Sequence, residues 1–337
     1  MFEYCGIIHV HSTYSDGSGS IPTILHAAQD ANLDFLVLTD HNSLGARTDG
    51  WEGWHGRTLL MVGDEVSGRR GHCLALGTRQ RVNHHQALQG MLGDIHHQDA
   101  LSFVAHPHGR YRPLFREHNH AWGDWTADSF TGLELWSYMF DWIKDFRYFR
   151  FWGHYRHPER HISGPDPQTL QKWDEICQLR PCVAIGGVDA HARKYGPLPM
   201  VVFPYKDAFR TLRTRVILTE ALTGSRERDM AAILGALQHG HCYIAYDGLE
   251  MAGGVRFQLS DGTSMMGDTA CFRSPLSIDV QLPREADLKF LWNGQTIATV
   301  RTRQHTFPVE KPGVYRAEAR LQGSPWIYTN PIYLRAQ

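Results

Sequence analysis

The chain lacks the features that would assign it to a membrane or nucleic-acid-binding class. No stretch approaches the roughly 20 apolar residues that span a bilayer, and the segment Met1–Cys5 has neither the basic nor the apolar region of a signal peptide. The formal net charge is only -1, so no global field recruits nucleic acid or an anionic membrane. We therefore expect a cytoplasmic protein that binds neither membrane nor extended nucleic acid, although a local basic patch could still hold phosphates.

Cysteine is also scarce, whereas histidine is abundant. The six cysteines contain no CxxC pair, which indicates reduced thiols rather than a disulfide framework or a zinc ribbon. The 21 histidines, against 34 lysines and arginines together, exceed what core packing requires. This excess directs attention to metal ligands.

Two apolar runs near opposite ends of the first 200 residues end in paired ligands. His9 and His11 close one run, and Asp189 and His191 follow the other. Residues spaced i, i+2 on a strand point to the same face, so each segment offers two ligands to one site. A structural pair is the alternative for His9 and His11 taken alone. Together the two segments indicate a metal-dependent hydrolase.

A third apolar run, 35–41, ends in Asp40 and His41. We favour His41 as a ligand, and we expect Asp40, which faces the other way, to orient a ligand from outside and to assist catalysis. Asp16 lies in a tight polar turn after the first run, where it either reaches back over the strand end or stabilises the turn itself.

Further candidates occur at or next to the ends of other predicted strands. Glu65 closes one strand, where it could bridge two cations or lie exposed. His72 opens the next strand. His106 precedes Pro107, which holds it extended. Nine candidates are too many for one ion, so we expect two or three clustered ions.

Strands alternate with helices over the first 250 residues. We expect strands at 5–11, 34–40, 59–66, 72–77, 101–106, 132–137, 182–188 and 242–246, and helices at 21–31, 85–100, 227–239 and within 140–180. This alternation favours a parallel α/β core. Ligands at strand ends fit a barrel, because barrel enzymes keep their sites at the carboxyl ends of the strands.

The pattern of the sequence changes beyond residue 250. Short alternating runs are separated there by Gly, Pro and Asp turns, which is typical of a small all-β domain of sandwich type. We therefore expect two domains, 1–250 and 251–337. The second contains no group of residues that indicates catalysis.

Four of these segments, in their order along the chain, resemble the motifs of the PHP (polymerase and histidinol phosphatase) superfamily. They are His9-Val10-His11, Thr39-Asp40-His41-Asn42, Ala105-His106-Pro107 and Asp189-Ala190-His191. The resemblance covers residues 5–247 and implies a distorted (β/α)7 TIM-like barrel, followed here by the small β-sandwich-like domain. The segment 325–333 resembles the end of a carbaryl-hydrolase-like branch.

The resemblance also implies which residues hold each ion. His9, His11, Glu65 and Asp189 would hold the first, Glu65 would bridge to a second completed by His72 and His106, and Asp16, His41 and His191 would hold a third. Mixed imidazole and carboxylate ligation suits Zn, Mn or Fe better than Mg alone. The implied cofactors are two or three such divalent ions.

A site with two or three ions deprotonates a bridging water near neutral pH and neutralises charge on the substrate oxygens. This chemistry fits phosphate esters best. We expect a phosphoesterase that cleaves a small or nucleotide-like phosphate ester, with a metal-bridging hydroxide as nucleophile. Two alternatives stay open: a hydrolase of non-phosphate esters, amides or carbamates, favoured by the tail, and a non-catalytic metal-binding scaffold.

Residues close to the ligands are candidates for contacts with the substrate. His108, Arg110 and Arg193 each lie within four residues of a proposed ligand. We expect His108 to protonate the leaving group and the two arginines to bind the substrate. The segment 107–161 interleaves arginines with aromatic residues, which could stack on a base but is more typical of a packed helix face.

Overall fold

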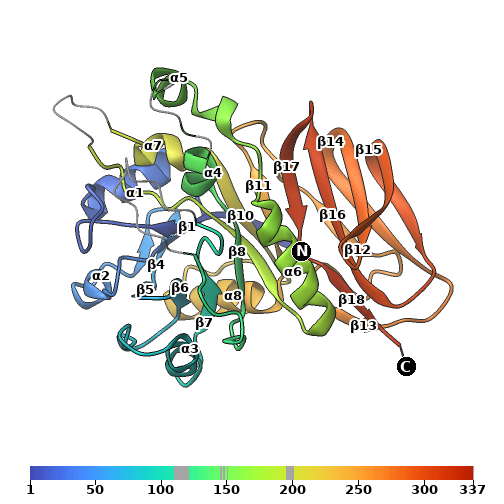
Figure 1. Cartoon of the computed structure of the whole chain (residues 1–337), viewed down its shortest axis with the longest axis horizontal. Helices are drawn as coiled ribbons and strands as arrows, with labels where there is room; N and C mark the ends of the chain where they lie inside the picture. Colours follow the sequence, from blue (N-terminus) through green and yellow to red (C-terminus); the bar gives the residue numbers. More distant parts are fainter. Residues whose placement is uncertain (110–120, 145, 147–148, 150, 195–200, 337) are drawn as a thin grey trace.

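The computed structural model describes residues 1–336 apart from 110–120, 145, 147–148, 150 and 195–200. These residues form a mixed α/β fold in which two β-sheets carry most of the buried core (Figure 1). None of the helices in this described part combines the length and apolar character that crossing a bilayer requires.

One sheet extends from the N-terminal half into the C-terminal strands. Its path begins with β12 (Arg256–Leu259), β14 (Leu276–Trp292), β16 (Gly313–Leu321) and β17 (Ser324–Thr329) and continues through six strands from the first 250 residues, in the order β11, β10, β1, β2, β4 and β3. The six strands from the first 250 residues are β1 (Phe2–Val10), β2 (Phe35–Leu38), β3 (Gly53–His55), β4 (Thr58–Val62), β10 (Leu212–Leu218) and β11 (Cys242–Tyr246). β1, β2 and β4 are parallel neighbours, and every residue of β2 and β4 is buried, as expected for strands covered on both faces.

A second sheet of five strands stands beside the first. It comprises, in spatial order, β5 (Asp64–Gly68), β6 (Gly71–Leu76), β7 (Leu101–Val104), β8 (Gly132–Ser137) and β9 (Val183–Gly187). β7, β8 and β9 are parallel, whereas β5 and β6 form an antiparallel hairpin.

The two sheets touch at both edges of the second one. At the β9 edge, the N–H of Val188 donates to the carbonyl of Ile8 at 3.1 Å. At the β5 edge, the N–H of Asn42 donates to the carbonyl of Glu65, also at 3.1 Å. These junctions bring the ends of β1, β2 and β9 and the start of β5 together, and the candidate ligands lie there.

Helices cover the sheets and shape the loops around these ends. They are α1 (Ile21–Asp30), α2 (Gly45–Thr48), α3 (Leu88–His96), α4 (Tyr138–Lys144), α5 (Phe151–Arg156), the 3-10 turn η3 (Pro158–His161), α6 (Pro167–Leu179), α7 (Tyr205–Ala208) and α8 (Arg226–His239). Asp166 caps α6 by accepting the N–H of Gln168 at 2.8 Å. α8 ends at Gly240, whose φ of 75° is the left-handed conformation common after a helix.

The C-terminal strands pack around a separate apolar cluster. They are β12 (Arg256–Leu259), β13 (Thr269–Cys271), β14 (Leu276–Trp292), β15 (Gln295–Val309), β16 (Gly313–Leu321), β17 (Ser324–Thr329) and β18 (Ile332–Arg335). β14 and β15 form a long hairpin whose Asn293-Gly294 turn has positive φ at both residues. β17 pairs with β11, so hydrogen bonding continues from one half of the chain to the other. The sandwich form and the boundary at residue 250 stay predictions.

The parallel core expected from the sequence is correct only in part, because β10 runs antiparallel between β1 and β11, and β6 runs antiparallel between β5 and β7. β10 was not predicted because its alternate residues Arg213 and Arg215 are charged. Both arginines are buried and form ion pairs with Asp247. Their shared partner lies 34 and 32 residues further along, and Arg215 also pairs with Glu3, so the charges that argue against a buried strand are offset by distant residues.

The strand expected at 59–66 is two strands that belong to different sheets. The break falls at Gly63, where an added Cβ would lie 2.8 Å from the carbonyl oxygen of Ala75. β4 therefore ends in the first sheet and β5 begins the second. This switch places Glu65 at the junction rather than at a strand end.

Candidate metal centre

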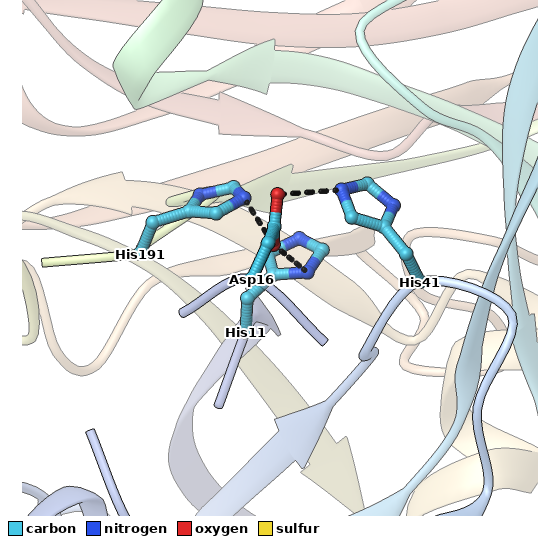
Figure 2. Close-up of side chains that lie close together, drawn as sticks. All are labelled: His11, Asp16, His41 and His191. Atoms are coloured by element: carbon cyan, nitrogen blue, oxygen red, sulfur yellow. Dashed lines mark ion pairs between the residues drawn. The ribbon is translucent and has the colours of Figure 1, made fainter. Parts of the chain in front are cut away.

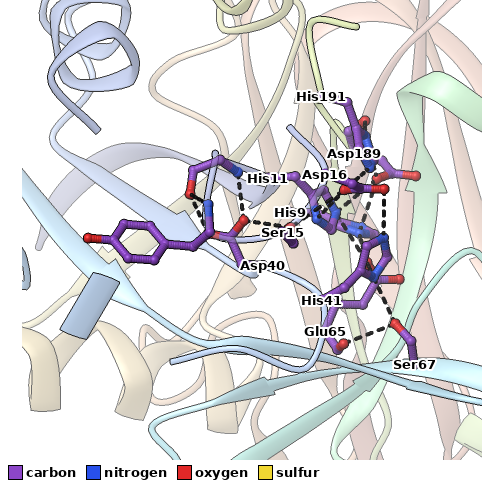
Figure 3. Close-up of polar contacts among 12 residues, drawn as sticks. His9, His11, Ser15, Asp16, Asp40, His41, Glu65, Ser67, Asp189 and His191 are labelled. Atoms are coloured by element: carbon purple, nitrogen blue, oxygen red, sulfur yellow. Dashed lines mark hydrogen bonds and ion pairs between the residues drawn. The ribbon is translucent and has the colours of Figure 1, made fainter. Parts of the chain in front are cut away.

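The structure brings all nine sequence-predicted ligands together at the junction of the two sheets. Figure 3 shows all of them except His72 and His106. Three overlapping groups have ligand atoms that lie within 4.8 Å of one another: His9, His11, Glu65 and Asp189; His11, Asp16, His41 and His191; and His41, Glu65 and His72. The remaining predicted ligand, His106, contacts Glu65 with its Nε2 atom 3.1 Å from Oε1.

The innermost group is completely buried. Nε2 of His9 and Nε2 of His11 each lie 3.1 Å from Oε2 of Glu65. The same two nitrogens lie 3.3 and 3.2 Å from Oδ1 of Asp189. These four residues are the set that the PHP resemblance implies for a first ion.

Glu65 also faces a second group of histidines. Its Oε1 atom lies 2.7 Å from Nδ1 of His72, in addition to the contact with His106. Its Oε2 atom lies 3.1 Å from Nδ1 of His41. The two oxygens of one carboxylate thus face different histidine sets, as a bridging ligand requires.

The third group lies nearer the surface and centres on Asp16 (Figure 2). Asp16 lies between His191 and His41, with oxygens 3.1 Å from Nε2 of His191 and 3.6 Å from Nε2 of His41. Nδ1 of His11 is 3.8 Å away, so His11 faces both this group and the innermost one. Asp16 is about one-third exposed, which leaves this group open to solvent.

The backbone is strained at three of the candidate ligands. His9, His106 and Asp189 have φ values of 68°, 30° and 51°, which is costly for residues other than glycine. His9 coincides with a register shift in the pairing of β1 with β2. Strain of this kind persists where the surrounding structure over-determines it, and it concentrates at functional sites.

The donor set fits divalent metal ions. Among the described residues, both ring nitrogens of His11 and Oδ1 of Asp189 are buried without a hydrogen bond of acceptable geometry. Such groups are costly to bury unless something else satisfies them. Imidazole and carboxylate donors converging within one shell match the ligands of zinc, manganese and iron.

The burial and close packing of these histidines and carboxylates shift their pKa values. Burial alone would raise the pKa of Glu65, but the facing histidines, His41 foremost, hold it well below its usual range. Burial lowers the pKa of His41 to about 3 and that of His191 to about 4. Both rings are therefore neutral near pH 7, which is the form that binds metal.

Glu134 is a residue of this centre that the sequence reasoning missed. Its Oε1 atom lies 2.8 Å from Nδ1 of His9, and its Oε2 atom accepts the backbone N–H of His106 at 2.7 Å. It is buried in the middle of β8. The signal was present as a lone acid inside the apolar run 132–137, and a carboxylate behind a ligand histidine is a common orienting arrangement.

Asp40 does not touch a ligand ring. It accepts hydrogen bonds from the N–H and hydroxyl of Ser12, at 2.7 and 2.6 Å, and from the hydroxyl of Ser15 at 2.6 Å. Figure 3 shows Asp40 and Ser15 beside the cluster rather than within it. Asp40 therefore holds the loop that carries Asp16, and its expected roles in orienting a ligand and in catalysis stay predictions.

The structure describes two of the three residues that were predicted to contact the substrate. Arg193 forms an ion pair with the carboxylate of Asp16, and its Nε donates to the Asp16 carbonyl at 3.1 Å, so it lies at the outer group. Nδ1 of His108 lies 2.8 Å from the hydroxyl of Thr169. Arg110 lies outside the described residues.

Most aromatic side chains described within 107–161 pack internally. Trp122, Trp136 and Trp142 are at most 4% exposed, whereas Phe149 and Trp152 are largely exposed. All three are packed in the interior, but only Trp142 lies on a helix, α4, so the expected helix face is found for Trp142 alone. Stacking on a base has no support from these three.

Comparison with solved structures gives similar chains at low identity. A two-domain protein from Bacteroides vulgatus ATCC 8482, containing a predicted PHP-like metal-dependent phosphoesterase, shares 15% identity over 98% of this chain and 95% of its own, with a TM-score of 0.48. A proposed metal-dependent phosphoesterase from Bifidobacterium adolescentis ATCC 15703 shares 13% identity over 58% of this chain and 91% of its own, with a TM-score of 0.37.

An amidohydrolase from Chromobacterium violaceum shares 16% identity over 59% of this chain and 90% of its own, with a TM-score of 0.34. No family model and no curated protein matches the chain. The first of these structures is described as PHP-like, which is the family that the sequence motifs resemble. All three TM-scores lie below 0.5, so the assignment of site residues stands on the geometry given above.

Proposed function

We propose that the chain is a metal-dependent hydrolase, and specifically a phosphoesterase that cleaves a small or nucleotide-like phosphate ester. One observation carries this proposal: three ligand groups overlap through His11, His41 and Glu65. Overlapping groups would hold two or three ions a few ångströms apart, which suits the displacement of an ester at phosphorus. Zinc, manganese and iron are the ions favoured by the donor set.

The candidate ligands would hold ions at different depths below the surface. His9, His11, Glu65 and Asp189 would hold the inner ion, with His72, His106 and the second oxygen of Glu65 completing a neighbouring position, and Asp16, His41 and His191 an outer one. When bound, such ions would polarise the substrate oxygens and neutralise the charge that builds on them. Glu134 fixes the His9 ring and Asp40 fixes the Asp16 loop.

His108 and Arg193 would act on the substrate itself. His108 lies two residues beyond the ligand His106 and is half-buried, so it would donate a proton to the departing oxygen. Arg193 is bound to Asp16 at the more open group, where its guanidinium would also neutralise a phosphate oxygen. Arg110 completes the proposed set from the sequence alone.

The proposal extends to the fold family. The junctions between the two sheets would close a distorted (β/α)7 barrel of PHP type. The C-terminal strands would form a sandwich attached to this barrel. The strand ends that converge at the two junctions support this closure.

A panel of four substrates tests the reaction class: 4-nitrophenyl phosphate, bis(4-nitrophenyl) phosphate, 4-nitrophenyl acetate and a 4-nitrophenyl carbamate. We expect turnover of at least one phosphate ester by the metal-loaded protein and its loss in Glu65→Gln. Glu285→Gln, a change on the surface, is the matched control. Turnover of only the acetate or carbamate would replace the phosphoesterase with a carbonyl hydrolase, and turnover of none would favour a metal-binding scaffold.

A further inference from the structure

The hydroxyl of Tyr205 lies against the backbone of the outer ligand group. It donates to the carbonyl of His11 at 2.8 Å, and the carbonyl of His191 is also within reach at 3.1 Å. The same oxygen accepts the N–H of Gly19 at 3.1 Å. One phenol oxygen therefore joins three chain segments that are distant in the sequence.

Each of these segments carries a ligand of the outer group. His11 and His191 are members of that group, and Gly19 ends the loop that carries a third member, Asp16. Tyr205 thus holds the backbone of three of the four outer ligands. It does so without contributing a ligand atom of its own to that group.

The chain returns to the ligand segment just before this tyrosine. The N–H of Val202 donates to the carbonyl of Arg193 at 3.0 Å, and Tyr205 is the first residue of α7. α7 packs against α1, the helix that follows the Asp16 loop; Figure 1 shows these two helices next to each other. Tyr205 is only 4% exposed, so close packing fixes the direction of its hydroxyl.

Gly19 allows the ring of Tyr205 to approach the loop closely. A Cβ added to Gly19 would overlap Cε2 of the ring. The φ of Gly19 lies outside the left-handed region that favours glycine. The closeness of the ring, and not the backbone conformation, is therefore what excludes a side chain at this position.

Loss of the hydroxyl would release both ends of the Asp16 loop from this contact. The carbonyl of His11 stands at one end of the loop and the N–H of Gly19 at the other, and each would lose a hydrogen bond. Buried backbone groups that lose a partner are costly, so the backbone shifts to find another. A shift of the loop relative to His191 changes the spacing of the ligand atoms.

We propose that Tyr205 is a positioning residue that sets the spacing of His11, Asp16 and His191 for the outer ion. The inference rests on the proposed function, since it concerns how one ion of the proposed centre is held. Tyr205 acts through the backbone of the ligands. Its removal therefore weakens the outer ion and leaves the inner ion in place.

Competition between a chromophoric chelator and the zinc-loaded protein tests this role without requiring turnover. The ion that Asp16→Asn weakens most identifies the outer position, because Asp16 belongs to the outer group alone. We expect Tyr205→Phe to weaken that ion by about tenfold, the lower end of the effect of removing an orienting partner. Gly19→Ala, whose added Cβ displaces the same ring, is expected to weaken the same ion.

Tyr315→Phe is the matched control. The hydroxyl of Tyr315 donates to the carbonyl of Lys311 at 2.7 Å, and the residue is 2% exposed. The control thus removes a buried tyrosine hydroxyl of the same kind from the C-terminal strands, and we expect it to leave the affinity of every ion unchanged. Unfolding temperatures measured with excess chelator show that the variants are folded before zinc is added.

Three results would overturn the inference. They are an unchanged affinity of the outer ion in both Tyr205→Phe and Gly19→Ala, an equal loss of all ions, and the same loss in Tyr315→Phe. The two proposals fail separately. A selective loss in Tyr205→Phe, in a protein that hydrolyses no phosphate ester, removes the phosphoesterase and leaves the positioning role. Hydrolysis of phosphate esters with an outer ion that is indifferent to Tyr205 does the reverse.

Discussion

Nδ1 of His9 lies 2.8 Å from Oε1 of Glu134, and both side chains are buried. This contact leaves Nε2 of His9 directed at Glu65 and Asp189. It fixes both the tautomer and the direction of the ring, which are the two properties that a metal ligand needs from its surroundings.

Glu134→Gln is therefore expected to weaken metal binding by about 10-fold to 100-fold, because loss of an orienting carboxylate has an effect of that size. Competition with a chromophoric chelator measures the affinity. Glu285→Gln on the surface is the control. An unchanged affinity in Glu134→Gln would show that His9 needs no orienting partner.

Asp40→Asn is expected to loosen the loop that carries Asp16, since one oxygen that accepts from Ser12 or Ser15 becomes a donor. Each hydrogen bond to a charged acceptor contributes about 1.5–3 kcal/mol. The outer group should lose its ion first, while the buried inner group keeps its own. Metal content measured at rising chelator concentration should show the loss of one weakly held ion; a uniform loss of all ions would contradict the positioning role of Asp40.

His108→Ala tests the assignment of the leaving-group acid. Phenyl phosphate has a poor leaving group that needs a proton, whereas 4-nitrophenyl phosphate does not. We expect kcat to fall by about 100-fold or more with phenyl phosphate and only slightly with 4-nitrophenyl phosphate. Full activity on both substrates would remove His108 from the catalytic group.

Asp64 makes the stability of the metal-free protein depend on pH. Burial raises its pKa to about 7, whereas the unfolded chain releases this proton near pH 4. Between about pH 4 and 7 the folded state thus binds more protons, so the contribution of Asp64 to the free energy of unfolding falls as the pH rises through that range.

Asp64→Asn removes this dependence. We expect the free energy of unfolding of the variant minus that of wild type to be larger at pH 8 than at pH 5. Urea unfolding with a chelator present measures both values. Asp128→Asn, at an exposed position, is the control. A stability difference between Asp64→Asn and wild type that is the same at both pH values would show that Asp64 ionises normally.

The candidate ligands could be predicted from the sequence because all of them except Asp16 lie at or next to an apolar run, which is a local signal. The reason given for their convergence was only partly correct. His9 and His11 were assigned to one face of a regular strand, but His9 lies at a register shift with positive φ. Asp189 likewise lies beyond the end of β9 at Gly187. The backbone leaves the regular strand conformation where the ligands converge.

What could not be predicted depends on partners that are distant in the sequence. Glu134 is 125 residues from His9, so the lone acid in the apolar run 132–137 was a local signal that did not identify its partner. β10 was missed because its two arginines form ion pairs with Asp247 and Glu3, which are distant in the sequence. The division of residues 59–66 between two sheets depends on the close approach of Ala75 to Gly63. Long-range contacts of this kind leave no periodicity in the sequence.

Elemental analysis of the purified, metal-supplemented protein tests most directly whether the clustered histidines and carboxylates hold metal ions. The metal content of Glu65→Gln is measured in parallel. Glu65 is common to two of the three ligand groups. We expect two or three divalent ions per chain in wild type and the loss of at least one in Glu65→Gln. Fewer than one ion per chain in wild type, or an unchanged content in Glu65→Gln, would contradict this expectation.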